Sequence, residues 1–418
     1  MSESTAAPTP EARAAAEQPV ATALPPLTLR EGLPVLTDTP EALHRYVAAL
    51  RAGRGPIAID TERASGYRYG QSAYLLQIRR DGAGTALIDP RALPDLSELV
   101  DVLRGPEWIL HAASQDLPCL AELGMAPVTL FDTELAGRLL GMDRVGLGPM
   151  VADVLGMSLA KGHGAADWSR RPLPADWLEY AALDVEVLIE LRAVLRARLE
   201  ETSKWEWAEQ EFAAVRDADA PPPRIDPWRR TSGIHRIRTR RGLAIVAHLW
   251  SAREEVARAT DTAPGRILPD SSIVAAAQAQ VRDTAGLRQL KDFHGRGAVR
   301  HQKAWAAALH QAWAVPEGQL PPNAARGEGP PPPRTWAQRD PVAAARLDRA
   351  RSALKERAAA LELPVENLLT PDLVRRLMWQ PPDEPGAVAD LLASAGARPW
   401  QVELTAGLLE QAIWPADG

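Results

Sequence analysis

Two proline-rich stretches limit most strongly what this chain can fold into. They read DADAPPPRIDP at residues 217–227 and QLPPNAARGEGPPPPR at residues 319–334. Because proline fixes φ and has no backbone N–H, neither stretch continues a helix or a sheet, and both are expected to act as semi-rigid spacers. We therefore expect a disordered tail at residues 1–30 and three folded regions, at residues 31–213, 228–316 and 335–418. Two linkers, at residues 214–227 and 317–334, would separate the folded regions.

The first region alternates between strand-like and helix-like segments. Four short apolar segments are predicted to be strands, at residues 56–62, 73–80, 84–90 and 107–114. Residues 95–104 are predicted to form a helix, and the rest of the region after the last strand is predicted to be mostly helical. This order predicts an α/β or α+β layer with helices packed on a sheet.

The second and third regions have apolar residues at helical spacing and no strand-like run, so both are predicted to be all-α. In the third region, Asp340 is expected to cap a long helix whose first residue is Pro341.

Two carboxylates stand at the end of the first predicted strand. Asp60 and Glu62 are two positions apart, so their side chains share one face, while Arg63 lies on the opposite face. Two like charges about 4 Å apart repel by roughly 4 kcal/mol at an effective dielectric near 20. A divalent cation would turn this repulsion into attraction, since hard cations such as Mg²⁺ take carboxylate oxygens. A solvated strand end is the alternative interpretation.

Further acidic residues follow in the same region. Asp116 comes after a later strand, where it could instead be the N-cap of a helix. Tyr180 and Asp184 are spaced i, i+4 on one helix face, beside an apolar stripe where a carboxylate is costly unless it is paired or still reaches water. Four carboxylates and one phenol at the ends of elements of one domain are enough to hold two Mg²⁺ or Mn²⁺ ions for phosphoryl transfer.

Composition narrows the class of protein. The single cysteine, Cys119, excludes an intramolecular disulfide framework and a multi-cysteine zinc site, which fits a reducing compartment and predicts a cytoplasmic location. No uninterrupted apolar run is long enough for a transmembrane helix, and the start of the chain lacks the pattern of a secretory signal. The formal net charge of −6 argues against nonspecific nucleic-acid binding by the chain as a whole.

The local charge is different between residues 224 and 241, where seven arginines face one acid. Such a cluster is either a nucleic-acid contact or the solvated start of a helix.

Three motifs resemble those of the DEDD 3′–5′ exonucleases, in the tyrosine-bearing subclass and within it the ribonuclease D family. They are DTE at residues 60–62, HAASQD at 111–116 and YAALD at 180–184, and similar segments lie between them, LFDTELAGRLLG at 130–141, LGMSLAKG at 155–162 and DWSRRPLP at 167–174. Residues 228–316 resemble an HRDC domain, and the final region resembles a second HRDC-like domain. The resemblance implies a ribonuclease H-like α/β exonuclease domain followed by two all-α HRDC-like domains.

The resemblance also implies roles for individual residues. Asp60, Glu62, Asp116 and Asp184 would ligate two divalent ions, Mg²⁺ or Mn²⁺, with Asp60 bridging them. Tyr180 would orient the attacking water, because the subclass that uses histidine places it five residues before the last aspartate, where this chain has Glu179.

Contacts with the nucleic acid are less well marked, because residues 63–74 differ from the enterobacterial version of this family. The candidate contacts are aromatic or basic residues near the motifs and in the arginine cluster: Arg63, Tyr67, Tyr69, Lys161, Trp168, Arg171, Arg229, Arg230, Arg236, Arg238, Arg240 and Arg241.

The chain is therefore expected to be a metal-dependent 3′–5′ exoribonuclease that trims structured RNA, tRNA precursors above all, and releases 5′-mononucleotides. Two alternatives remain. A DNA exonuclease in repair would use the same carboxylates, and no motif here reads the 2′-OH. A non-catalytic RNA-binding adaptor gains nothing from clustered acids that repel phosphate, so the complete set of motif residues argues against it.

Overall fold

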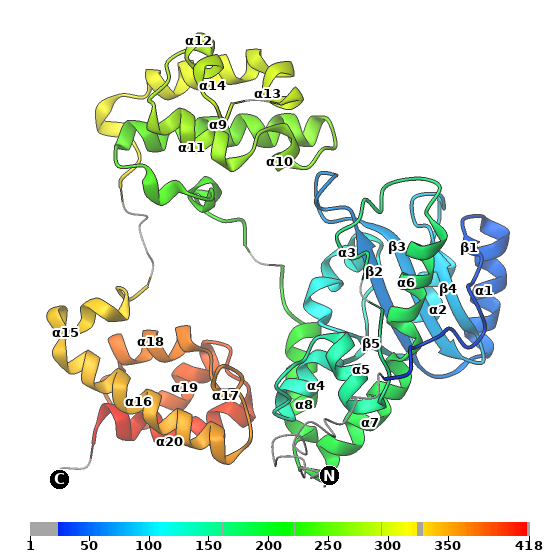
Figure 1. The fold of residues 1–418 in the computed structure, drawn as a ribbon. Coiled ribbons are helices and arrows are strands. Elements are labelled where there is room, and N and C mark those ends of the chain that lie inside the picture. The colour runs from blue at the N-terminus through cyan, green and yellow to red at the C-terminus, as the bar shows by residue number, and fades with distance from the viewer. Residues whose placement is uncertain (1–23, 161, 221, 294, 324–328, 416–418) are drawn as a thin grey trace, which may run out of the picture.

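The computed structural model describes residues 24–160, 162–220, 222–293, 295–323 and 329–415. The first region contains a mixed six-stranded sheet in the order β1-β4-β3-β2-β5-β6 (Figure 1). The strands are β1 (Leu36–Thr37), β2 (Arg54–Arg63), β3 (Ala73–Asp81), β4 (Gly84–Ile88), β5 (Glu107–Leu110) and β6 (Thr129–Asp132). β2, β3 and β4 are antiparallel neighbours, whereas β1–β4, β2–β5 and β5–β6 are parallel pairs.

The four predicted strands and the predicted helix of the first region are confirmed. β1 and β6 were not predicted, and residues 129–132 fall in a stretch expected to be mostly helical. β6 has four residues and pairs only with β5, so it is too short to show an alternating pattern.

Helices cover both sides of this sheet. They are α1 (Pro40–Ala52), α2 (Ser97–Leu103), α3 (Leu117–Glu122), α4 (Thr133–Leu139), α5 (Leu147–Leu155), α6 (Ala175–Glu186), α7 (Leu188–Glu201) and α8 (Trp205–Arg216), with a 3₁₀ turn, η2 (Ala113–Gln115), before α3. α6 packs against β2, β3 and β4, which brings the segment that contains Tyr180 and Asp184 over the strand that ends in Asp60 and Glu62.

The second region is helical. Its elements are η3 (Pro227–Arg230), η4 (Ile234–Arg236), α9 (Arg240–Ala259), α10 (Pro264–Ile267), α11 (Asp270–Gln278), α12 (Thr284–Gln289), α13 (Arg296–Arg300) and α14 (Gln302–Ala314), followed by η5 (Glu317–Gln319). They enclose a core of their own around Leu249, Ile273 and Trp305.

The third region is also helical, with η6 (Pro333–Thr335), α15 (Trp336–Arg339), α16 (Pro341–Ala360), α17 (Val365–Leu368), α18 (Pro371–Trp379), α19 (Ala387–Ser394) and α20 (Pro399–Ile413). The predicted start of α16 is confirmed, since Asp340 is its N-cap and accepts a hydrogen bond from the Ala343 N–H at 2.9 Å.

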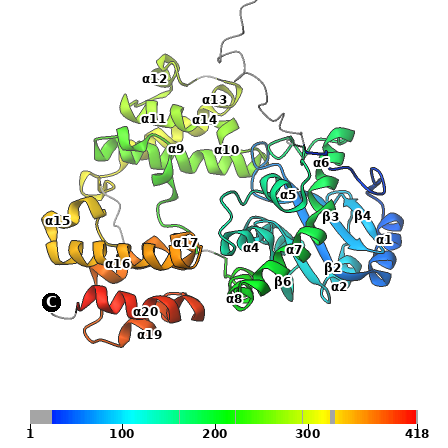
Figure 2. The same cartoon turned by 60° about the horizontal axis from the view of Figure 1, so that its bottom comes forward.

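The third region packs on α8 of the first, and the two lie side by side in both views (Figures 1 and 2). Trp400 stacks on Trp207 with ring centroids 4.9 Å apart, and its indole N–H donates to Glu211 at 3.0 Å. Arg398 forms two hydrogen bonds to the same carboxylate, at 2.9 and 2.6 Å. One continuous hydrophobic cluster therefore runs from the sheet into the third region.

The second region rests on the loop of residues 64–70, which directly follows β2 and which we call the docking loop. The Ala263 N–H donates to the Tyr67 carbonyl at 3.0 Å, and the Arg266 guanidinium donates to the Gly66 carbonyl at 2.8 Å. The same guanidinium lies 4.0 Å from the centre of the Tyr67 ring. The strand with the two acids thus continues directly into the contact between the first two regions.

The predicted tail needs one correction. Residues 1–23 lie outside the described part of the chain, but Leu27 is buried against Val151 and Leu183, and its N–H donates to the Ser158 carbonyl at 2.9 Å. The end of the predicted tail therefore belongs to the folded first region, because its apolar residues complete the packing beside α5 and α6. Among the described residues, no helix is both long and apolar enough to cross a membrane.

Candidate metal centre

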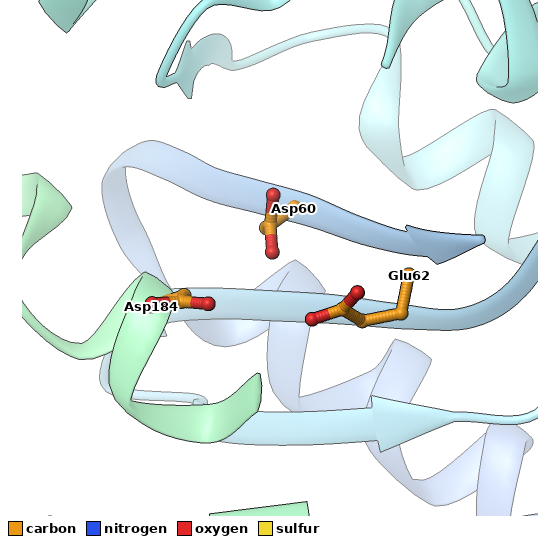
Figure 3. Close-up of side chains that lie close together, drawn as sticks. All are labelled: Asp60, Glu62 and Asp184. Atoms are coloured by element: carbon orange, nitrogen blue, oxygen red, sulfur yellow. The ribbon is translucent and has the colours of Figure 1, made fainter. Parts of the chain in front are cut away.

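Three of the four predicted carboxylates converge at the end of the sheet. Asp60, Glu62 and Asp184 each offer a ligand oxygen, and these oxygens all lie within 4.8 Å of one another. Figure 3 shows the three carboxylates pointing toward one another, two from β2 and one from α6. The convergence follows from the period-two alternation of β2 and from the packing of α6 across its end.

Asp116 lies beside this cluster with a different partner. It stands at the start of α3, but its side chain makes no capping hydrogen bond there. Its carboxylate instead accepts a hydrogen bond of 2.6 Å from the Thr61 hydroxyl, on the face of β2 opposite Asp60 and Glu62. An ordinary N-cap therefore does not account for this side chain, although its oxygens are not part of the three-residue cluster.

Burial raises the pKa values of all four carboxylates, and neighbouring carboxylates raise those of Asp60 and Glu62 further. Loss of hydration by burial, followed by the charges of Asp116, Asp184 and Glu62, raises the pKa of Asp60 well above its usual value. Burial and then the charges of Asp184 and Asp116 raise the pKa of Glu62 to about 9, with Arg63 acting in the opposite direction.

Burial raises the pKa of Asp184 to about 7, against a hydrogen bond with Tyr180 that lowers it. Burial also raises the pKa of Asp116, although the Thr61 hydroxyl and Arg63 oppose the rise. The raised pKa values show that negative charge is unfavourable in this cluster, and a bound divalent cation would offset that charge. The all-oxygen donor set fits hard ions such as Mg²⁺ or Mn²⁺.

Tyr180 completes the centre on α6. Its hydroxyl interacts with the Asp184 carboxyl group and lowers the pKa of that group, and its ring meets that of His163 edge to face, with centroids 5.7 Å apart. Burial and the neighbouring carboxylates raise its pKa, so the phenol stays neutral and can donate a hydrogen bond. A cavity of about 480 Å³ opens beside Tyr180 and Asp184, within the range of small-ligand pockets. Its other lining residues are Arg144, Leu147, Gly148, Pro149, Ala152, Ser158, Leu159, Ala160, Gly162 and Gly164.

Sequence reasoning missed the role of Asp132, the last residue of β6. Its carboxylate accepts hydrogen bonds from the N–H groups of Ala112 and Ala113, at 3.1 and 2.8 Å, and from those of Glu134 and Leu135 at the start of α4. Ala112 has a φ of +58°, so the turn that leads to Asp116 has a strained backbone and depends on this anchor. The Asp-Thr-Glu sequence at residues 132–134 is an N-cap signature that could have revealed half of this role.

The two tyrosines proposed to contact RNA belong to the docking loop. Tyr67 lies under Arg266, and the Tyr69 N–H donates to Asp261 at 3.2 Å while its hydroxyl accepts from Arg258 at 3.3 Å. In this structure both side chains hold the second region in place. Arg63 reaches the other way and donates to the Gln115 carbonyl at 2.8 Å, next to Asp116.

Two further candidates for RNA contact have structural partners. The prediction is wrong for Trp168, which is fully buried, whereas Arg171 is exposed and its contact with RNA stays a prediction. Trp168 is fully buried beside Trp177, with its indole N–H donated to the His163 carbonyl at 3.1 Å, so the ring has no free face for a base. The Arg171 guanidinium makes two hydrogen bonds to the buried Asp89 carboxylate, at 2.6 and 2.7 Å, and others to backbone carbonyls. Each side chain is thus held by a partner that the sequence motifs do not reveal. Lys161 lies outside the described residues.

Six of the seven arginines in the cluster divide into two sets. The bonded set, Arg229, Arg240 and Arg241, donates to backbone carbonyls of residues 312–322 at the far end of the second region. The exposed set, Arg230, Arg236 and Arg238, projects into solvent. The bonded set closes the helical region, whereas the exposed set remains free for phosphates.

Comparison with known proteins agrees with this architecture. Residues 34–200 match the family model described as a 3′–5′ exonuclease, residues 242–309 match the HRDC domain, and residues 329–413 match the 3′ to 5′ exonuclease C-terminal domain. The final region, expected to be a second HRDC-like domain, thus matches a C-terminal model of exonucleases.

Relatives and solved structures extend over most of the chain. Ribonuclease D of Gluconacetobacter diazotrophicus is 32% identical over 311 residues, which cover 72% of this chain and 77% of that protein. A crystal structure of a protein from Bifidobacterium adolescentis is 38% identical with a TM-score of 0.87, and covers 93% of this chain and 99% of that one. Escherichia coli RNase D, described as an exoribonuclease involved in structured RNA processing, is 26% identical with a TM-score of 0.66, over 91% and 99% of the two chains.

A mixed sheet with an acidic centre at the end of its second strand, followed by helical regions, defines a 3′–5′ exonuclease whose fold implies divalent metal ions. The identity over most of the curated relatives goes further: the chain belongs to the ribonuclease D family. It is a hydrolytic 3′–5′ exoribonuclease, and its substrate is RNA.

Proposed function

We propose that Asp60, Glu62, Asp116 and Asp184 hold two divalent cations, Mg²⁺ or Mn²⁺, at which the terminal phosphodiester of an RNA 3′ end is hydrolysed to a 5′-mononucleotide. The observation that carries this proposal is the convergence of three carboxylate oxygens within 4.8 Å, with the fourth carboxylate adjoining. When bound, such ions neutralise charge on the phosphate oxygens and generate a nucleophile at neutral pH. A nucleophilic side chain is then not needed.

The protein's own groups orient the reactants. Tyr180 is neutral, so its hydroxyl can donate a hydrogen bond to the attacking water or to a phosphate oxygen beside Asp184. Asp132 holds the turn before Asp116 and so fixes where that carboxylate lies. The adjoining cavity of about 480 Å³ would receive the last nucleotide.

The substrate that we propose is a structured RNA with a free 3′ end, such as a tRNA precursor in the cytoplasm. The exposed set of arginines would contact the phosphates of the RNA body, and the acidic centre would act only on the end. Phosphate contacts position a strand without reading its sequence. Single-stranded DNA would enter the same site less well. We also propose that the three regions are separate domains with the boundaries given above, except that the first also includes the end of the predicted tail around Leu27.

The test uses the full chain and a 5′-labelled tRNA precursor with a 3′ extension, in Mg²⁺ or Mn²⁺. We expect Asp60→Asn and Asp184→Asn each to lower the rate of shortening by at least about a hundredfold, since each removes a charge that the reaction needs. RNA binding through the second region should persist in both. Asp101→Asn is the matched control, because this exposed aspartate faces only Arg104 on the surface.

Shortening at the parental rate in either site variant would contradict the site assignment. Faster shortening of a matched DNA strand would indicate a DNA exonuclease. Undiminished binding without shortening in Mn²⁺ would indicate an adaptor.

A further inference from the structure

Gln77 is a buried amide without a partner. It lies in the middle of β3 and is fully buried. Neither its Nε2 nor its Oε1 has a hydrogen-bond partner among the residues that the structure describes. Burying such a group unpaired costs stability, whereas an apolar side chain of the same shape would not.

The position of Gln77 places this amide beside the metal centre. β3 pairs antiparallel with β2, and Gln77 is the register partner of Asp60. Side chains of directly paired residues lie on the same face of a sheet, with Cβ atoms about 4.5–5.5 Å apart. α6, which contributes Asp184, packs over this face of both strands. The amide is therefore enclosed between Asp60 and α6.

Two other buried polar side chains, Arg79 and Gln401, show how such groups are satisfied in this fold. Arg79 lies two residues further along the same face and pairs with Glu186 at 3.2 Å and with the Thr85 hydroxyl at 2.8 Å. Gln401, another buried glutamine, donates to the Asn367 carbonyl at 2.8 Å and accepts from the Arg398 N–H at 3.0 Å. Elsewhere in the described residues, Arg253, Arg346, Asn367 and Arg375 each leave one buried atom without a hydrogen bond, whereas Gln77 leaves both of its polar atoms unpaired, directly opposite Asp60. This indicates a partner that arrives later.

We propose that Gln77 is a positioning residue for the metal ligands. When Asp60 ligates a cation, the Gln77 Nε2–H donates a hydrogen bond to the Asp60 carboxylate and holds it in the ligating orientation. An ionised carboxylate has about four lone-pair sites, so it can bind an ion and still accept this bond. Outer partners of this kind orient metal ligands in proteins. The inference rests on the proposed role of Asp60 as a metal ligand.

The test measures metal binding and metal-free stability separately in the full chain. Free Mn²⁺ is titrated by electron paramagnetic resonance, and the melting temperature is measured in a chelator. We expect Gln77→Leu and Gln77→Met each to weaken Mn²⁺ binding by roughly tenfold or more, the range found when such outer partners are removed. Their metal-free melting temperatures should equal or exceed that of the parent, because the unpaired amide is gone.

Gln401→Leu is the matched control, since it removes a buried glutamine whose amide is bonded and far from the centre. It should lower the metal-free melting temperature and leave Mn²⁺ affinity unchanged. Parental Mn²⁺ affinity in Gln77→Leu, or a metal-free melting temperature below the parent in both Gln77 variants, would overturn the inference. Equal Mn²⁺ binding by the parent and by Asp60→Asn would instead show that the proposed metal site is wrong, and the inference would fall with it.

Discussion

At the scale of single residues, the raised pKa values of the acidic centre predict how stability depends on pH. Without divalent cations, the pKa of Glu62 is about 9 and that of Asp184 about 7, whereas both groups titrate near pH 4 in an unfolded chain. The folded chain therefore keeps protons that the unfolded chain has released. The contribution of these two groups to the free energy of unfolding is fully present below about pH 4. It is lost as the pH rises through the two folded-state pKa values, by up to about 1.4 kcal/mol per pH unit for each group.

Calorimetry in a chelator between about pH 5 and 9 should show this decline, and Mn²⁺ should largely remove it. In Glu62→Gln, the decline of the melting temperature above about pH 7 should be smaller, because the glutamine amide does not titrate. A melting temperature that stays constant over this range without metal would contradict the electrostatic account.

Alternation along one strand predicted that Asp60 and Glu62 share a face, and i, i+4 spacing predicted the same of Tyr180 and Asp184. That these two pairs meet at one site was implied by the resemblance to the DEDD exonucleases. Side chains whose roles depend on tertiary packing were not predictable in the same way. In sequence, Trp168 resembles an exposed RNA contact, whereas in the fold it is fully buried beside Trp177. The ion pair between Arg171 and Asp89 was not predictable either. The proposed role of Gln77 was not predictable from the sequence, since it depends on the pairing of this residue with Asp60 in the neighbouring strand.

At the scale of elements, the arginine cluster before and at the start of α9 allows a matched comparison. Changing the exposed set, Arg230, Arg236 and Arg238, to glutamine should lower the dependence of RNA affinity on salt concentration. For single-stranded RNA, the slope should fall by about 0.7 for each phosphate that an arginine no longer neutralises. Filter binding at several salt concentrations measures it.

The same substitutions in the bonded set, Arg229, Arg240 and Arg241, should mainly lower the melting temperature, because backbone carbonyls would be left without their donors. If substitution of the exposed set left the slope unchanged, the cluster would be a structural linker and no RNA contact.

Long periodic helices and the apolar strands next to the motifs were predictable as elements. β6 was not, although Asp132 at its end anchors the turn before Asp116. The four residues of β6 form a strand because they pair with β5, and the periodicity of a single sequence does not reveal which segments pair.

At the scale of the whole molecule, the junction between the first and third regions depends on one carboxylate. Arg398→Ala would leave Glu211 without its guanidinium in a nearly water-free contact between Trp207 and Trp400. Removing one partner of a buried pair costs about 3–5 kcal/mol, and somewhat less here because the arginine is partly exposed. Urea unfolding should show this decrease, whereas Arg104→Ala, at an exposed ion pair, should change the free energy of unfolding by less than about 0.5 kcal/mol. Equal effects of the two variants would contradict the structural role of the junction.

The division into one mixed and two helical regions was predictable from the proline-rich stretches, but their mutual contacts were not. Such contacts depend on single side chains such as Trp400 or Arg266, which no local pattern in the sequence distinguishes from their neighbours.

The docking loop has one consequence for the length of the product. β2 carries the two acids and leads directly into the docking loop, on which the second region rests. The distance between the exposed set of arginines, which we propose to bind RNA, and the acidic centre is therefore fixed by the fold. Trimming of a tightly folded RNA would then stop when the remaining single-stranded 3′ segment reaches a length set by this distance, whatever its base sequence.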